Sequence, residues 1–212
     1  MLAPMKTQYD KSGPTLVKTM KKRQFDAYYC STAEEAVEKV LELIPEGDVV
    51  SWGGVATVDQ LGIKDRLRQR NQPLIDRDTA KTPDERMDML RQALTCDTFL
   101  MSSNAISADG QLVNIDGNAN RVAALCYGPE SVLVIAGMNK VMADLDSAIA
   151  RARQVAAPAN AQRFDIKTPC AVTGSCGDCT SSDCICCQMV ITRACRPAGR
   201  IKVILVGEDL GF

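Results

Sequence analysis

No histidine occurs anywhere in the sequence, and this absence limits the chemistry that the protein can perform. A Ser-His-Asp or Cys-His catalytic arrangement is excluded, and so is a zinc site with imidazole ligands. Proton transfer must therefore use Asp, Glu, Lys, Tyr or Cys side chains. A metal ion would have to be bound by thiolates and carboxylates.

The chain also lacks an excess of charge of either sign. Twenty-five Lys and Arg side chains stand against 26 Asp and Glu, which gives a net charge of −1. Nucleic-acid binding needs a clustered basic surface. The only basic run, residues 18–24, fits the solvated face of a helix. We therefore expect no nucleic-acid partner.

Long apolar runs are missing as well. The most apolar stretch, residues 131–138, is far too short to cross a bilayer. Residues 1–13 contain no apolar core of a signal peptide. We expect a soluble, cytoplasmic protein with no membrane partner. Its length and its hydrophobic content of 46% suit one globular domain, which we place at residues 1–212.

Cysteine, by contrast, is concentrated near the C-terminal end. Seven of the ten cysteines lie within residues 167–195, which we call the cysteine segment and treat as an excursion from the domain. In a reducing cytosol such clusters more often bind metal or carry out redox chemistry than form disulfides. Cys30, Cys96 and Cys126 lie in apolar stretches, and we expect them to be small core residues.

Hydrophobic periodicity predicts strands that alternate with helices. Helices are expected over residues 6–24, 31–44, 56–71 with a break at Gly62, 82–94, and 144–157 ending at Pro158. Strands are expected over residues 25–30, 48–54, 73–76, 96–107, 110–115 and 131–137, with a last strand after Gly199. The strands on either side of Ala108-Asp109-Gly110 should form an antiparallel hairpin. The alternation predicts an α/β fold with a mainly parallel sheet.

A glycine pair, Gly53-Gly54, follows one predicted strand and precedes a predicted helix. Glycines there permit a tight turn and a close approach of the backbone to an anion. Any α/β protein needs such turns, so both a structural role and a ligand-binding role stay open.

Polar residues gather at predicted strand ends in the centre of the sequence, where an open α/β sheet binds ligands. They are Asp109, Asn114, Asp116, Asn118, Asn120, Arg121, Asn139 and Lys140. Arg121 and Lys140 are suited to hold a carboxylate or phosphate, and Asp116 is the candidate for proton transfer. The alternative is that Asp109-Gly110 and Asp116-Gly117 are turns and nothing more.

Four sequence segments resemble the LUD-domain proteins, the family of lactate-utilisation protein C, and in particular its short single-domain branch. They are SSNAISADGQLVNIDGNANRVAALCYGP, VLVIAGMNKV, PC…GSCGDC and GRIKVILVGEDLGF. The resemblance implies a fold similar to ribose-5-phosphate isomerase, glucosamine-6-phosphate deaminase and CoA transferases. In that fold a central, mainly parallel mixed sheet is flanked by helices.

Lactate-utilisation protein C accompanies two iron–sulfur subunits in the oxidation of L-lactate. The resemblance therefore implies a role in organic-acid utilisation or in associated electron transfer. It also implies that the protein binds a small anionic metabolite and works with iron–sulfur subunits. An oligomer of the chain is one of the possible assemblies. Whether the chain is an enzyme stays open. The alternative is a non-enzymatic sensor of redox state or metal that uses the cysteines of residues 170–187.

The expected ligand pocket is formed by Gly53, Gly54, Thr57, Asn120, Arg121, Asn139 and Lys140. One departure from the family concerns its Gly-Gly-Ser-x-Thr turn, because Val55 stands here in the serine position. Valine has no hydroxyl group, so anion binding at this turn depends on Thr57 and on backbone amides.

The branch also carries a Cys-x5-Cys-x2-Cys-x6-Cys pattern, which Cys170, Cys176, Cys179 and Cys186 match. Four thiolates within 17 residues can surround one tetrahedral centre. The spacing is that of neither a bacterial ferredoxin nor a zinc ribbon. An iron–sulfur cluster, zinc, and no metal with redox-active thiols all stay open.

Overall fold

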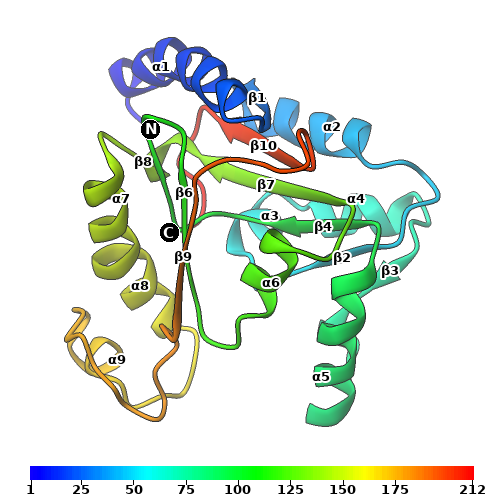
Figure 1. Ribbon diagram of the computed structural model, residues 1–212, viewed down its shortest axis with the longest axis vertical. Helices are drawn as coiled ribbons and strands as arrows, with labels where there is room; N and C mark the ends of the chain where they lie inside the picture. The colour runs from blue at the N-terminus through cyan, green and yellow to red at the C-terminus, as the bar shows by residue number, and fades with distance from the viewer.

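The computed structural model describes residues 1–212, and a six-stranded sheet lies at its centre (Figure 1). Every neighbouring pair of strands in it is parallel. The order is β1 (Asp26–Cys30), β10 (Ile201–Val206), β7 (Ser131–Gly137), β4 (Thr98–Met101), β2 (Val50–Trp52) and β3 (Leu74–Ile75). The α/β class predicted from the sequence is confirmed.

Helices cover both faces of this sheet and flank the second sheet described below. They are α1 (Ala3–Lys22), α2 (Ala33–Leu43), α3 (Ala56–Gln60), α4 (Ile63–Gln69), α5 (Pro83–Gln92), α6 (Asn120–Cys126), α7 (Leu145–Arg151), α8 (Ala157–Ala161) and α9 (Pro169–Thr173). Short 3-10 turns are η1 (Arg77–Thr79), η2 (Ala93–Thr95) and η3 (Met138–Lys140). None of the helices combines the length and the apolar character that crossing a bilayer requires.

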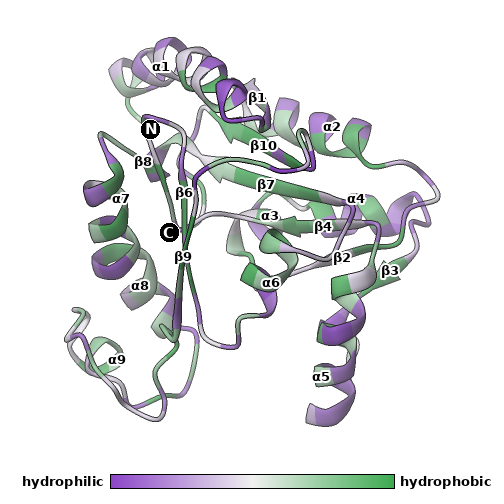
Figure 2. Cartoon of the chain, in the orientation of Figure 1, coloured by the Kyte–Doolittle hydropathy of each residue, from purple (hydrophilic) through white to green (hydrophobic).

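Two apolar cores lie on opposite faces of the sheet. Val132 and Val134 of β7 pack into the core beneath α1 and α6, whereas Leu133 and Ile135 pack into the core beneath α2, α3 and α4. A strand buried on both faces reads as a continuous apolar run. Figure 2 shows this pattern, with hydrophobic central strands and helices that are polar on their outer sides.

A second sheet of four strands lies between the central sheet and α7 (Figure 1). Its order is β8 (Val141–Met142), β5 (Ala105–Ser107), β6 (Leu112–Asp116) and β9 (Gln188–Thr192). The β5–β6 and β6–β9 pairs are antiparallel, which confirms the predicted hairpin around Asp109. One of its faces, with Val113 and Ile115, packs on Ala148 and Ala152.

The structure differs from the sequence predictions at three elements. The segment 96–107 is not one strand, because the chain leaves the central sheet after β4 and enters the second sheet as β5. Pro158 does not end its helix, which passes through the π-helical turn η4 (Ala152–Ala156) into α8. A proline is tolerated there because the first residues of a helical segment need no N–H partner. Strand β9 was hidden within the cysteine segment.

The predicted end signals are present at three helix boundaries. Thr32 caps α2 by accepting from the Glu35 N–H group at 3.3 Å. Thr82 caps α5, with Pro83 in its first position. Gly62 separates α3 from α4 with a left-handed φ of 64°, where a side chain would strain the backbone.

The isolated cysteines follow the sequence prediction only in part. Cys30 and Cys96 are buried as expected, but Cys126 is exposed, because α6 turns Val122, Ala124 and Leu125 inward instead. Cys195 is fully buried, and its Sγ atom accepts from the Ile201 N–H group at 3.2 Å. It belongs to the core beside β10 and not to a thiol cluster.

Candidate functional site

A cavity of about 660 Å³ opens where the chain leaves several strands at their carboxyl ends. Gly53 follows β2, Ser102 follows β4, Lys140 lies just beyond β7, and Asp116 ends β6. Parallel strands deliver their carboxyl ends to one edge of a sheet, and ligands of α/β proteins bind at that edge. The topology therefore brings together groups that are far apart in the sequence.

Thr57, Ser102 and Lys140 form the floor of this cavity. The ammonium group of Lys140 donates to Ser102 Oγ at 3.0 Å and to Thr57 Oγ1 at 3.2 Å. The two hydroxyl groups lie 3.3 Å apart. The three side chains come from the first turn of α3, the residue after β4 and η3, so only the folded chain assembles them.

The floor lysine carries a charge that no carboxylate balances. Lys140 is 3% exposed, and the charged groups that act on it most are two further cations, Arg151 and Arg121. Burial, followed by the charges of Arg151 and Arg121, lowers the pKa of Lys140 to about 7. Near neutral pH this amine is thus present in both its charged and its neutral forms.

Arg121 forms one wall and also holds the floor in place. Its guanidinium donates to Asn104 Oδ1 at 3.0 Å and to the carbonyl oxygen of Ile115, and its Nε atom pairs with Asp116 Oδ2 at 3.5 Å. Burial lowers the pKa of Arg121, and the Asp116 carboxylate opposes this shift. Asp116 also accepts from the Val122 N–H group at 3.3 Å, so its carboxylate form has partners.

The glycine pair allows two arginine side chains to cross the β2–α3 turn. A Cβ atom on Gly53 would lie 3.1 Å from Arg121 Cδ, and one on Gly54 would lie 3.0 Å from Arg77 Nη2. Val55, which replaces the serine of the family pattern, is buried in the core. The glycines are therefore needed for close approach, and the valine packs inward.

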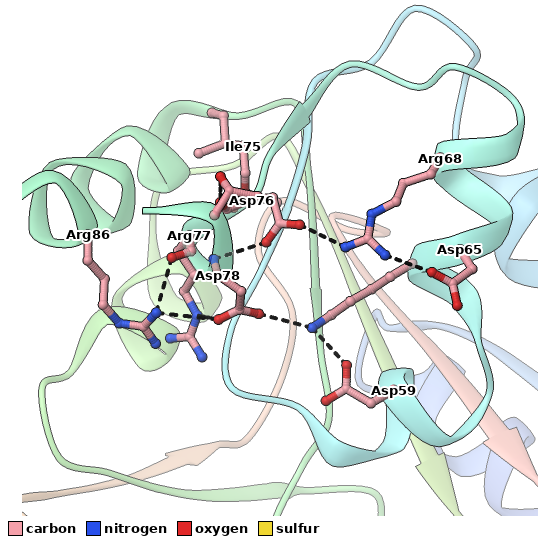
Figure 3. Close-up of polar contacts among 11 residues, drawn as sticks. Asp59, Asp65, Arg68, Ile75, Asp76, Arg77, Asp78 and Arg86 are labelled. Atoms are coloured by element: carbon pink, nitrogen blue, oxygen red, sulfur yellow. Dashed lines mark hydrogen bonds and ion pairs between the residues drawn. The ribbon is translucent and has the colours of Figure 1, made fainter. Parts of the chain in front are cut away.

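A network of ion pairs forms the rim on the α4 and η1 side (Figure 3). Lys64 Nζ lies 2.7 Å from Asp59 Oδ1 and 3.3 Å from Asp78 Oδ2, and Arg86 lies 3.4 Å from the other oxygen of Asp78. Partial burial opposes the effect, but Lys64 and then Arg77 hold the pKa of Asp78 below its usual value. These carboxylates are already engaged by cations.

Basic groups outnumber acidic ones along the whole cavity. The basic lining residues are Lys64, Arg77, Arg86, Arg121, Lys140 and Arg163, and the acidic ones are Asp59, Asp78, Asp116 and Asp183. Six basic side chains against four acidic ones give the lining an excess of basic groups, although the chain as a whole carries a net charge of −1. An anionic ligand would supply the missing negative charge.

Most of the residues expected from the sequence do meet in this cavity. Those that line it are Gly53, Gly54, Thr57, Asp116, Asn120, Arg121 and Lys140. Asn139 does not, because its side chain turns away and accepts from the Leu210 N–H group at 3.1 Å. Ser102 and Arg77 were missed. Ser102 was missed because it lay inside the strand predicted over residues 96–107, whereas β4 ends at Met101.

The last residues of the chain cover the floor lysine. Gly211 has a left-handed φ of 59°, and a Cβ atom there would lie 2.7 Å from Thr57 Oγ1 and 3.0 Å from Lys140 Nζ. Its N–H group donates to Gln60 Oε1 at 2.9 Å, and Phe212 lines the cavity beside it. Only glycine permits this close approach.

The cysteine segment forms a further wall. Cys184 and Cys187 line the cavity, and the Cys187 thiol lies 3.3 Å from the Cys184 carbonyl oxygen. Desolvation by surrounding atoms of the segment, followed by the nearby thiols of Cys184, Cys170 and Cys176, raises the pKa of Cys186 to about 12, although the residue as a whole is exposed. The segment is thus part of the site and brings several thiols near one another.

The four predicted metal ligands differ in their surroundings. Cys170 and Cys179 are half-buried, whereas Cys176 and Cys186 are exposed. No three cysteine, aspartate or glutamate side chains converge on a point at which they could together hold one ion. The arrangement therefore does not fit a ready-made cluster site, and a metal bound by these four thiols stays a prediction.

Comparison with known proteins gives a family and a fold. The family model for the LUD domain matches residues 14–206. A crystal structure of a DUF162 family protein from Deinococcus radiodurans is similar with a TM-score of 0.53 and 11% sequence identity, over 95% of this chain and 98% of that chain. Ribose 5-phosphate isomerase A from Neisseria gonorrhoeae gives a TM-score of 0.34 and 14% identity, over 52% of each chain. No curated protein matches the sequence.

Proposed function

Because the chain belongs to the LUD-domain family, we propose that it acts in the utilisation of organic acids of the lactate type and binds a small organic anion in the cavity described above. The observation that carries this proposal is the unbalanced charge at the floor. Lys140 and Arg121 line the cavity, the charge of Arg151 acts on Lys140 from behind them, and Asp116 is the one side-chain carboxylate that pairs with any of the three.

A buried cation without a counter-charge costs free energy, because it has lost its hydration. A carboxylate beside Lys140 would offset that cost and would favour the ammonium form. Binding should therefore raise the pKa of Lys140 from about 7 towards its ordinary value, with uptake of a proton near neutral pH. Proton uptake on binding would identify this lysine as part of the anion site.

Asp116 is the group that we propose for proton transfer. It lines the cavity, and its side chain is 12% exposed. The rim carboxylates of Asp59 and Asp78 are both paired with Lys64, so they are less free to act. A substrate hydroxyl placed above the floor could give its proton to Asp116, with Arg121 holding the carboxylate in position.

The binding proposal is tested by calorimetric titration of the purified protein with L-lactate and, as a neutral analogue, lactamide. Lactate should bind and lactamide should not. Lys140→Met should weaken lactate binding at least about tenfold, since a hydrogen bond to a charged group contributes about 1.5–3 kcal/mol. Equal binding of the amide, or an unchanged variant, would contradict the proposal.

Lys202→Met is the matched control for that titration. Lys202 is also a partly buried lysine that bonds to a serine, Ser131, at 2.9 Å. It lies near the amino end of β10, at the opposite edge of the sheet from the cavity. Its removal should leave lactate binding unchanged.

A second candidate function, redox or metal sensing, is favoured by one observation: the cysteine segment lines the same cavity through Cys184 and Cys187. Oxidation of these thiols, or metal binding by them, would alter the cavity wall that the cysteine segment forms. If a metal is bound, Cys170, Cys176, Cys179 and Cys186 would hold it, and an iron–sulfur cluster there would supply electron transfer to partner subunits. Nothing in the anion-binding proposal depends on such a centre.

Anaerobic purification followed by a visible spectrum and metal analysis tests the second candidate, on the wild type and on Cys176→Ala. Visible absorption with stoichiometric iron and sulfide, lost in the variant, would support electron transfer. Stoichiometric zinc without colour would support a structural metal. Reconstitution with two iron–sulfur subunits should then give lactate-dependent dye reduction if the chain works with such partners.

A further inference from the structure

The floor lysine has the surroundings of a reactive amine and not those of a structural ion pair. An ammonium group carries three donors, and protein hydroxyls accept from it at two positions, Thr57 and Ser102. No protein acceptor takes the third N–H, and the Lys140 side chain lines the cavity beneath Gly211 and Phe212. A structural lysine at this depth would be expected to pair with a carboxylate.

We propose that Lys140 is a catalytic nucleophile that adds to the carbonyl carbon of a 2-oxo acid and forms an imine with it. This inference rests on the proposed function, since the carboxylate of the 2-oxo acid would occupy the same positive cavity. It goes beyond anion binding by assigning a covalent step and a substrate class.

The substrate class follows from two cations, one in α6 and one in η3, that contact the same segment between β2 and α3. Arg121 packs against Gly53, and Lys140 bonds to Thr57, four residues further along. Arg121 is also near enough to act on the charge state of Lys140. An anion beside Arg121 and an electrophilic carbon beside Lys140 must therefore be close together in the ligand, as a carboxylate and a carbonyl group are in a 2-oxo acid.

The covalent step is balanced without an oxidant or a reductant. The lone pair of the neutral amine forms the C–N bond while the carbonyl π electrons move to oxygen. A proton then passes from nitrogen to that oxygen, for which the hydroxyls of Ser102 and Thr57 are already in contact with Nζ. A proton taken up from solvent then lets the new hydroxyl group leave as water while the nitrogen lone pair forms the C=N bond. The product is the protonated imine, whose positive charge the carboxylate of the substrate offsets.

Two features of the site activate the amine. Burial and neighbouring cations favour the neutral form of a lysine, which is the nucleophilic form. Here that neutral form becomes substantial near pH 7, whereas an exposed lysine needs a pH near 10. Gly211 and Phe212 cover the floor and reduce the access of water to an imine formed there.

The test is reductive trapping on the full chain, with pyruvate as the probe and cyanoborohydride as the reductant, followed by peptide mapping. One adduct should form on the peptide that contains Lys140, at least about tenfold above any other lysine. Lys140→Arg should abolish it, because a guanidinium cannot be deprotonated. Lys202→Arg is the control and should leave the adduct unchanged. Absence of an adduct, or labelling spread over surface lysines, would overturn the inference.

The pH dependence of trapping is a second readout that needs no variant. In the wild type, labelling at Lys140 should rise through pH 7 and level off, following the neutral amine. Labelling that rises only towards pH 10 would overturn the inference, because it is the behaviour of an ordinary lysine.

L-lactate separates this inference from the function on which it rests, because it has a carboxylate but no carbonyl group. Lactate that binds and protects Lys140 from labelling supports both. Lactate that binds while pyruvate forms no adduct overturns the imine and leaves anion binding standing. Labelling of Lys140 that lactate does not affect supports the reactive amine and contradicts a lactate-type anion site.

Discussion

Two walls of the same cavity are built in different ways. The floor consists of Thr57, Ser102 and Lys140, which lie a few residues beyond the ends of β2, β4 and β7 and are held by hydrogen bonds of 3.0 to 3.3 Å. The cysteine segment reaches the cavity through a loop at residues 182–187, and its thiols other than the buried Cys195 are half-buried or exposed. A group on a packed scaffold is held in position, whereas a group on an exposed loop can rearrange when a ligand arrives.

This contrast bears on the chemistry of each wall. A buried, unpaired cation is tolerated only where surrounding packing forces it, and such strain is characteristic of functional sites. Thiols that lie near one another in sequence need no packing to meet. The floor is therefore ready for its ligand, and the cysteine segment would have to gather its thiols around a metal.

Removal of Arg121 should give the largest effect on stability. Arg121→Met leaves Asp116 buried without its cation and frees Asn104 Oδ1 from one donor. Breaking a buried pair costs about 3–5 kcal/mol, to be measured as the free energy of unfolding in urea. Arg66→Met is the control, because the Arg66–Glu38 pair is exposed and should change stability by less than about 1 kcal/mol. Equal losses of unfolding free energy in Arg121→Met and Arg66→Met would show that the Arg121–Asp116 pair beside the floor is held no more firmly than an exposed pair.

Lys140→Met should act in the opposite direction, with a smaller magnitude. At pH 6 the lysine is charged and buried, so its replacement by an apolar chain of similar length should stabilise the protein by about 1–3 kcal/mol. Anion binding would be lost in the same variant. A variant less stable than the wild type at pH 6 would show that the ammonium is well satisfied by Thr57 and Ser102.

The pH dependence of wild-type stability tests the charge state of the buried Lys140. The pKa of Lys140 is lowered from 10.5 to about 7 by folding, so the unfolded chain binds more protons between these values. The contribution of this residue to stability should therefore increase as the pH rises from about 7 towards 10. The difference between the wild type and Lys140→Met, measured by urea unfolding at several pH values, should shrink over this range. A constant difference would contradict the lowered pKa.

The smallest effect is expected in the cysteine segment. Cys176 is exposed, so without metal Cys176→Ala should change the unfolding free energy by no more than about 0.5 kcal/mol. The measurement is repeated with and without a chelator. A large loss of unfolding free energy in Cys176→Ala, matched in the wild type by adding the chelator, would show that a metal orders the segment. The cysteine segment and the floor would then be equally ordered.

Local sequence signals were sufficient for most of the fold. The apolar runs of β7 and β10 predict buried strands because both of their faces are covered. Thr82-Pro83 and Gly62 predict helix ends because capping and left-handed backbone are properties of a few residues. Strand β9 could not be predicted, because its pairing with β6 lies far away in the sequence.

The site could be predicted only where its residues follow predicted strands. Asp116 and Lys140 were identified in this way, and both line the cavity. Asn139 was included because it adjoins Lys140, but consecutive side chains of an irregular segment can point in different directions, and this one holds the last residues of the chain. Arg77 was missed because nothing local shows that η1 folds back over Gly54.

The sequence by itself therefore determined the α/β class, the alternation of elements, the absence of imidazole chemistry and the family, because these depend on composition, periodicity and local motifs. Tertiary structure alone decided which cations share one cavity and which carboxylates balance them. It also decided that Thr57, Ser102 and Gly211, which are far apart in the sequence, surround one buried amine. Charge balance and burial arise from packing between distant segments, and they set the pKa of Lys140 and with it the chemistry that we propose.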